Sequence, residues 1–290
     1  MSRGTLAAAL SPEDVERGYN NRAAVPDHPR WLAHYPDASA RARAALNSRL
    51  DLRYGPGPKE MLDLFVPAGG ARGTFVFWHG GYWRSFDKSD FSFVAEPFVA
   101  RGHAVAVVNY DLCPDVSIAT IVGQARRAMQ WLVRERPTHG ADSARIVVGG
   151  HSAGGHIAAM LYTTDWAEHG LAQDPIVGGI SLSGVHDLAP MVQFSFNVDF
   201  KLDEAEAVRL SPTNLQPRSR VPLLLAAGAD ETSEFIRQTQ ALWDAWPANR
   251  PAGASEPMLI PGRNHFTVVA DFADTESEIT RATLALFERE

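Results

Sequence analysis

Short apolar runs alternate with amphipathic stretches along most of the chain. The apolar runs have the length of β-strands, and runs such as 105–108 and 223–227 are apolar at every position, as expected for strands covered on both faces. Strands are predicted over residues 61–66, 74–78, 104–108, 145–149, 178–182, 222–226 and 256–260. Helices are predicted over 96–101, 118–135, 153–163, 234–246 and 275–289. This alternation predicts an α/β protein with a mostly parallel, doubly wound sheet and helices on both of its faces.

Two segments depart from the alternation. Residues 11–50 are rich in Arg and Ala and are broken by prolines, so we expect 1–50 to form a helical segment that packs on the core or over the site entrance. Residues 185–217 form a long mixed stretch after a strand, and such an insertion in a doubly wound sheet lies over the ligand crevice. We expect a small cap or lid there, within a single domain spanning 1–290.

Composition and charge exclude several classes of protein. The 290 residues are 45% hydrophobic and 21% charged, which is ordinary for a globular protein, and the net charge of -7 argues against a general nucleic-acid binder. Cys113 is the only cysteine, which fits a reducing compartment. The apolar run 6–10 is too short for a signal-peptide core, and no later run reaches membrane-spanning length. We expect a soluble cytoplasmic protein that acts on a small molecule and binds neither nucleic acid nor membrane; a homodimer is left open.

The strongest chemical signal is the sequence Gly-His-Ser-Ala-Gly at 150–154. It follows the apolar run 146–148 and opens a helix of small residues, which is the strand–turn–helix context of a nucleophile elbow. A bare G-x-S-x-G also occurs by chance, but its position at a strand end in an α/β pattern favours the catalytic interpretation. The sequence therefore predicts that Ser152 is a nucleophile.

A second signal is the sequence His-Gly-Gly-Tyr-Trp at 79–83, directly after a predicted strand. It could be no more than a tight turn, but in hydrolases that use the elbow the loop at this position supplies oxyanion-hole donors, and glycines let the backbone approach the oxyanion closely. The expected donors are the backbone N–H groups of Gly81, Tyr82 and Ala153.

The general base is expected at His265, which alone among the ten histidines follows the last predicted strand, in the chain order Ser, acid, His. His151 and His156 flank the elbow, and His186 lies in the insertion. Four further histidines are predicted to lie in surface segments: His28, His34, His103 and His139. The acid should follow the strand near 222–226, where Asp230 and Glu231 are both candidates; one would orient the imidazole, and the other would be solvated or cap a helix.

These motifs together resemble the kynurenine formamidase (arylformamidase) branch of the α/β-hydrolase fold, which is related to hormone-sensitive-lipase-like esterases. The resemblance rests on HGGYW at 79–83, GHSAGG at 150–155, the Glu231 to Gln238 string and Asn-His-Phe at 264–266. The segments at 19–22, 54–57 and 62–65 look similar to the N-terminal part of bacterial members, so the match covers most of the chain.

The resemblance implies roles for particular residues. It implies Glu231 as the acid and Gly81 with Tyr82 in the oxyanion hole, although many members carry Asp at the acid position, where this chain has Glu preceded by Asp230. It also implies a serine hydrolase that cleaves an aryl formamide, such as N-formylkynurenine, to the arylamine and formate through a formyl-serine intermediate. A short-chain carboxylesterase is the alternative, and a non-catalytic binding protein of this fold is a second one.

Aromatic and basic residues near the motifs could bind the substrate. Trp83 is the expected contact, and Tyr82, Phe194 and Phe196 could complete an aromatic wall, unless these side chains are ordinary core. Arg84 or Lys88 could pair with a substrate carboxylate, or simply face solvent. We expect no cofactor and no metal, because the chain lacks the paired His, Asp and Glu spacing of a metal site.

Overall fold

A central eight-stranded sheet organises the computed structural model, which describes residues 10–141, 143–171 and 174–288. The strands lie in the order β1-β2-β4-β3-β5-β6-β7-β8, with β1, β2 and β4 paired antiparallel and the other neighbours parallel. Their bounds are β1 Ser48–Arg53, β2 Met61–Phe65, β3 Thr74–Trp78, β4 Ala104–Val108, β5 Ile146–His151, β6 Ile176–Leu182, β7 Leu223–Gly228 and β8 Met258–Ile260. The predicted mostly parallel α/β sheet is confirmed, and each predicted strand overlaps an observed one.

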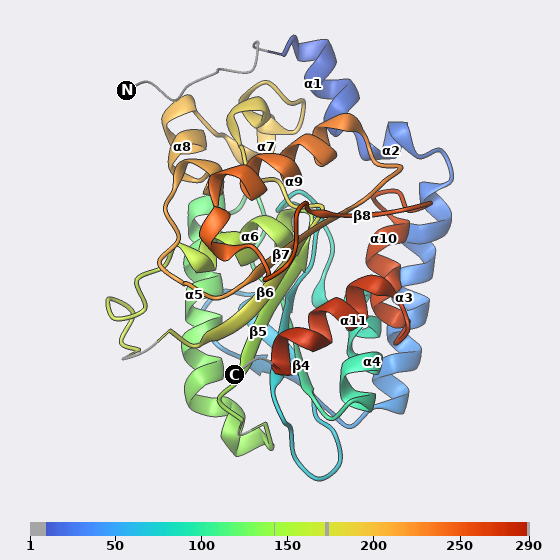
Figure 1. Ribbon diagram of the computed structural model, residues 1–290, viewed down its shortest axis with the longest axis vertical. Helices are drawn as coiled ribbons and strands as arrows, with labels where there is room; N and C mark the ends of the chain where they lie inside the picture. Colours follow the sequence, from blue (N-terminus) through green and yellow to red (C-terminus); the bar gives the residue numbers. More distant parts are fainter. Residues whose placement is uncertain (1–9, 142, 172–173, 289–290) are drawn as a thin grey trace.

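Helices cover both faces of the sheet (Figure 1). One face carries α5 (Ile118–Glu135), α6 (Ala153–Tyr162) and α9 (Ser233–Ala245), and the other carries α3 (His28–Ala45), α4 (Ala95–Ala100) and α11 (Glu278–Ala285). The shorter helices are α1 Pro12–Tyr19, α2 Asn21–Ala24, α7 Asn197–Phe200, α8 Glu204–Arg209 and α10 Thr267–Ala270. The 3-10 turns are Lys88–Val94, Arg136–His139, Ala189–Val192, Pro212–Asn214, Pro247–Asn249, Asp271–Ala273 and Leu286–Glu288.

The alternation of side chains along each strand builds two apolar cores. In β3, Val76 and Trp78 join the core beneath α5, α6 and α9, while Phe75 and Phe77 join the core beneath α3, α4 and α11. Successive side chains of a strand point to opposite faces, so an all-apolar strand supplies both layers. Within the described residues, no helix combines the length and apolarity that crossing a bilayer requires.

The N-terminal segment is helical only as far as Ala45, so the prediction of helix through residue 50 is wrong at its end. Residues 1–9 of that predicted segment lie outside the described residues. Strand β1 pairs antiparallel with β2 at the edge of the sheet, and its charged residues Arg49, Asp51 and Arg53 are exposed. An edge strand that buries little apolar surface carries no clear period-two pattern, which is why the sequence did not reveal it.

The insertion predicted over 185–217 lies between β6 and β7 and contains α7 and α8. These two helices and α1 gather at one end of the molecule, at the top of Figure 1. The insertion is anchored to the body of the protein, because Phe200 is buried in the core that also contains Trp83. Whether it moves as a lid stays a prediction.

His103 corrects one sequence-based expectation. It was predicted to lie on the surface but is only 2% exposed, with its ring stacked on Phe287 at a centroid distance of 4.0 Å. Burial lowers the pKa of His103 to about 4. The covering side chain comes from the C-terminal end of the chain, and a contact between such distant segments leaves no local pattern.

Candidate active site

Ser152 sits on a sharp turn between β5 and α6. Its backbone has φ 56° and ψ -119°, a conformation that residues other than glycine rarely adopt. The flanking glycines are required for steric reasons. A Cβ on Gly150 would lie 2.2 Å from the Gly154 oxygen, and one on Gly154 would lie 1.9 Å from the Trp78 oxygen. The glycines of the motif therefore let the strand and helix close tightly enough to hold Ser152 at the carboxyl end of the sheet.

The loop after β3 approaches the same point. Gly81 has φ 103°, and a Cβ there would lie 2.4 Å from the Ser85 oxygen, so no other residue fits without rearrangement. Tyr82 and Trp83 also have positive φ, at 51° and 54°. Among the described residues, the backbone N–H groups of Gly81 and Tyr82 have no hydrogen-bond acceptor. Ala153 is the first residue of α6, where a backbone N–H has no partner within the helix.

A buried network holds this loop in place. His79 Nε2 lies 3.1 Å from Asn109 Oδ1, and Asn109 Nδ2 donates to Asp87 Oδ2 at 2.7 Å. The Tyr110 hydroxyl donates to the His79 backbone oxygen at 2.8 Å. Burial lowers the pKa of His79, which favours the neutral ring. These contacts give His79 a structural role in positioning the oxyanion loop.

Glu231 and His265 meet at the ends of β7 and β8. Glu231 Oε2 lies 2.7 Å from His265 Nδ1, and both side chains are buried. Glu231 Oε1 accepts hydrogen bonds from the Ser183 hydroxyl and, at 2.8 Å, from the Gly228 N–H. The neighbouring Asp230 is exposed. Of the two acids that the residues alone left open, the structure brings Glu231 to the imidazole and leaves Asp230 in solvent.

The arrangement directs His265 Nε2 away from Glu231, and His265 and Ser152 line one cavity. Within the described residues no hydrogen bond joins Ser152 to His265; such bonds are often long until substrate binds. The ring of His151 packs on His265 with centroids 4.6 Å apart. Burial, and secondarily the neighbouring His265, lowers the pKa of His151 well below its ordinary value, so His151 adds no second positive charge beside the base.

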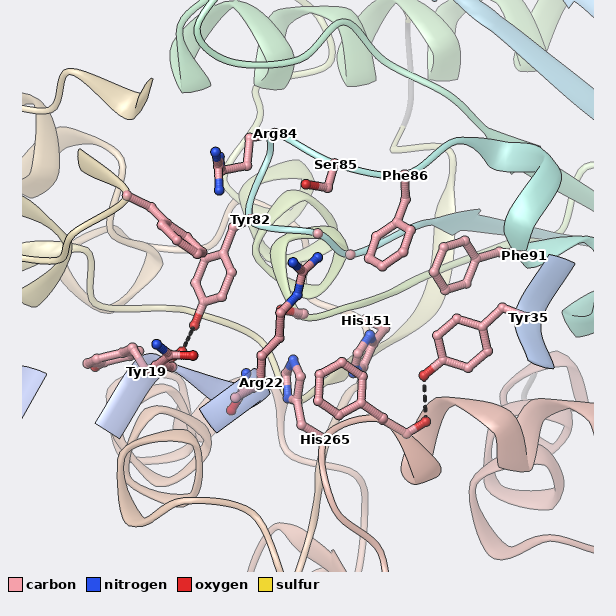
Figure 2. Close-up of a pocket in the computed structure, with 17 residues that line it drawn as sticks. Tyr19, Arg22, Tyr35, Tyr82, Arg84, Ser85, Phe86, Phe91, His151 and His265 are labelled. Carbon is pink, nitrogen blue, oxygen red and sulfur yellow. Dashed lines mark hydrogen bonds between the residues drawn. The ribbon is translucent and has the colours of Figure 1, made fainter. Parts of the chain in front are cut away.

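The cavity is lined mainly by aromatic side chains (Figure 2). They come from the N-terminal helices, the oxyanion loop, the insertion and the segment after β8, and they include Tyr35, Tyr82, Phe86, Phe91, Phe196 and Phe266. The Tyr82 hydroxyl donates to the Tyr19 backbone oxygen at 2.6 Å, which ties the loop to α1. Such a cavity can hold an aromatic group beside a nucleophilic serine.

Comparisons with known proteins agree with this geometry. The BD-FAE family model matches residues 62–195. Kynurenine formamidase from Salmo salar is 28% identical over 99% of this chain and 97% of its own length, and the Drosophila melanogaster enzyme is 27% identical over 79% and 78%. A candidate thioesterase from a Silicibacter species is 31% identical, with a TM-score of 0.82 over 93% of this chain and 99% of that one. The chain belongs to the kynurenine formamidase-like branch of the α/β-hydrolase superfamily.

As an α/β-hydrolase of this branch, the chain is an enzyme of the hydrolase class. Esterase B from Lactobacillus rhamnosis has the same fold, with a TM-score of 0.65 at 20% identity over 93% of this chain and 96% of its own. Membership of the formamidase-like family does not by itself identify which side chains contact the substrate. For these side chains the structure differs from the sequence-based expectations.

Trp83 does not line the cavity of this α/β-hydrolase. It is fully buried beneath the loop, against His156 and Phe200 at centroid distances of 5.1 and 5.6 Å. Phe194 is also buried, so the wall at this side is formed by Tyr82 and Phe196. Trp83 instead supports the floor of the oxyanion loop.

Lys88 and Arg84, the two basic residues expected near the substrate, differ in whether they reach the cavity. Lys88 is buried, and its Nζ pairs with Asp51 at 2.6 Å and Asp63 at 2.9 Å, so it belongs to the β1–β2 edge and does not face the cavity. Arg84 does line the cavity. The sequence assigned no role at the site to two contributors: Ser183, which holds Glu231, and Arg22 of the N-terminal segment, which lines the cavity.

Proposed function

We propose that Ser152, His265 and Glu231 form a catalytic triad that hydrolyses an aryl formamide, of which N-formylkynurenine is an example. The observation that carries the proposal is the Glu231–His265 hydrogen bond beside the Ser152 elbow, in a cavity with aromatic walls. The likeness to kynurenine formamidases over nearly the whole chain supports the choice of substrate class.

In the first step, His265 Nε2 accepts the Ser152 proton while Ser152 Oγ attacks the formyl carbon. The backbone N–H groups of Gly81, Tyr82 and Ala153 stabilise the oxyanion, each being worth about 3–4 kcal/mol of barrier in comparable sites. The protonated imidazole then gives its proton to the arylamine nitrogen as the C–N bond breaks, leaving a formyl ester on Ser152.

In the second step, water replaces the arylamine. His265 takes a proton from water, the resulting hydroxide attacks the formyl ester, and the same proton returns to Ser152 Oγ as formate leaves. Throughout, the Glu231 carboxylate stabilises the imidazolium that forms at each stage. The neutral state of His151 fits this cycle, because a second cation beside His265 would oppose its protonation.

An ester substrate is the alternative, since the same steps cleave a short acyl ester. The experiment is a comparison of kcat/KM for an aryl formamide, the matching aryl acetate and an octanoyl ester on one preparation, with Ser152→Ala as the control for contaminating esterase. We expect the aryl formamide to exceed the octanoyl ester clearly. An octanoyl ester hydrolysed faster than every aryl formamide tested would replace the formamidase proposal by the esterase one.

We also propose a cytoplasmic location and a reaction that needs no cofactor. The single cysteine, Cys113, supports a reducing compartment because the chain cannot form an internal disulfide. Side chains and backbone dipoles suffice for each step above, so activity should survive prolonged dialysis against a chelator. A loss of activity that zinc or manganese restores would overturn the cofactor-free proposal.

A further inference from the structure

The charged side chains that line the cavity are cationic, although the chain as a whole is acidic. The chain carries a net charge of -7. Yet the lining side chains in the described part of the chain include two arginines, Arg22 and Arg84, and neither Asp nor Glu. A cation with no neighbouring carboxylate in a cavity of this kind favours anionic ligands, both in binding and in the approach from solution.

Arg84 already has partners. Its Nε lies 2.5 Å from Asp199 Oδ2 of the insertion, and its guanidinium carbon lies 4.4 Å from the centre of the Phe196 ring. The carboxylate neutralises the charge of Arg84, and the ring holds the guanidinium plane. Arg84 therefore joins the insertion to the oxyanion loop rather than presenting an available charge.

Arg22 is different. It lies on α2, it is exposed, and no carboxylate among the described residues pairs with it. Figure 2 shows its side chain extending from α2 into the group of lining residues, between Tyr82 and His265 in that view. The Arg22 guanidinium is thus a cation without a carboxylate partner, and it lines the cavity that contains Ser152 and His265.

The segment that carries Arg22 is firmly attached. The Tyr19 hydroxyl donates to Glu234 Oε2 at 2.8 Å, and the Tyr19 backbone oxygen accepts the Tyr82 hydroxyl. The Asn20 side chain accepts the Ala23 N–H at 3.1 Å and so caps α2. These contacts fix the backbone from which Arg22 reaches the cavity, so ligand binding has to order the Arg22 side chain but not the segment that carries it.

We propose that Arg22 binds a carboxylate on the leaving group, so that the preferred substrates are anionic aryl formamides. The assignment to the leaving group rests on the proposed function, because a formyl group has no substituent that could carry a charge. Guanidinium and carboxylate can form two parallel charge-assisted hydrogen bonds, a geometry that neither a carboxamide nor an ester on the substrate reproduces.

The test uses two substrates that differ only in charge: 3-(2-formamidophenyl)propanoate and the corresponding propanamide. Wild-type protein is compared with Arg22→Gln, Arg22→Lys and the control Arg41→Gln. Arg41 lies exposed on α3 and does not line the cavity, so its substitution changes the net charge by the same amount at a distance. Thermal melts show whether each variant is folded.

We expect wild type to favour the anionic substrate by about tenfold or more in kcat/KM. This is the lower end of the range for hydrogen bonds to charged groups, because Arg22 is exposed to solvent. Arg22→Gln should lower kcat/KM for the propanoate by about tenfold, mainly through KM, and change the propanamide by less than about twofold. Arg22→Lys should retain part of the preference, and Arg41→Gln should retain all of it. Raising the salt concentration should reduce the wild-type preference.

Equal losses on both substrates in Arg22→Gln, or an undiminished preference for the anion, would overturn the inference. So would a preference that disappears in Arg84→Gln but not in Arg22→Gln. The same pair of compounds made as phenyl acetates separates this inference from the proposed function. If the formamides are inert but the acetates show an Arg22-dependent preference for the anion, Arg22 keeps its role and the formamidase proposal fails.

Discussion

Glu231 Oε2 lies 2.7 Å from His265 Nδ1, while the other oxygen of the same carboxylate is held by the Ser183 hydroxyl and the Gly228 N–H. The carboxylate is therefore fixed by donors on both sides, and it fixes the imidazole in turn. This relationship determines which ring nitrogen is left to serve Ser152. It also separates Glu231 from Asp230, which is exposed.

Replacing Glu231 by Gln should lower kcat by a factor of about 10⁴, with little change in KM. Replacing the triad acid by its amide has an effect of this size in serine proteases. The amide can no longer stabilise the imidazolium, so the loss falls on the transition state. Asp230→Asn is the matched control and should cost far less. The measurement is kcat of both variants on one substrate, with thermal melts; greater damage from Asp230→Asn in two well-folded proteins would mean that the acid is Asp230.

Ser183 acts through Glu231, so it is a positioning residue. Ser183→Ala removes one donor from a buried carboxylate, and we expect kcat to fall about tenfold with KM nearly unchanged. Ser233→Ala, at an exposed serine near the same loop, should leave kcat unchanged. A purely structural role for Ser183 would appear instead as a lower melting temperature with kcat intact.

The elbow glycines lead to a prediction about stability. A Cβ on Gly154 would lie 1.9 Å from the Trp78 oxygen, so Gly154→Ala should displace the elbow and destabilise the protein by several kcal/mol or prevent folding. The control is Gly123→Ala within α5, where the nearest atom would be 3.9 Å away. That change should stabilise the helix by about 0.5–1 kcal/mol. Chemical denaturation measures both; equal effects would contradict the steric argument.

Buried histidines make stability depend on pH. Burial lowers the pKa of His156 to about 4 and that of His186 to about 3, from 6.5 in the unfolded chain. Below pH 6.5 the unfolded chain binds protons that the folded chain does not, so this stability is fully present above that pH and is lost as the pH falls toward the folded values. The expected slope is about 1.4 kcal/mol per pH unit for each histidine.

The window from pH 6.5 to 5 isolates the histidines, because most carboxylates titrate below it. Denaturant unfolding at several pH values gives the slope, and His156→Gln should reduce it by the contribution of one histidine. A free energy of unfolding that does not change between pH 7 and 5 would show that these rings are protonated, or solvated, in the folded protein.

The sheet and its helices were predictable because their signal is local. An all-apolar strand such as β3 feeds both cores, and the sequence shows that directly. Strand β1 has one neighbour and exposed charged residues, so its signal was absent. The turn motifs located Ser152 and Gly81 because steric demands there leave few residue choices. The base, His265, was located by its place after the last strand in the chain order Ser, acid, His.

Side-chain contacts between distant segments were not predictable. Tyr82 and Trp83 are adjacent and both have positive φ, yet only Tyr82 faces the cavity while Trp83 packs beneath the loop. Ser183 follows β6 and reaches Glu231 after β7, and Arg22 reaches the cavity from the N-terminal segment. The sequence showed that segment 19–22 is similar to the N-terminal part of the family. Only the packing of α1 and α2 shows that this segment lies at the site.

Catalysis by Ser152 is tested most directly by measuring kcat of Ser152→Ala on an aryl formamide, in folded protein free of other hydrolases. We expect a loss of at least about a thousandfold, because the oxyanion donors and the cavity remain but the nucleophile is gone. The melting temperature should stay close to that of wild type, since the serine hydroxyl has no hydrogen-bond partner among the described residues. Retention of more than a few per cent of wild-type kcat would contradict the assignment of Ser152 as the nucleophile.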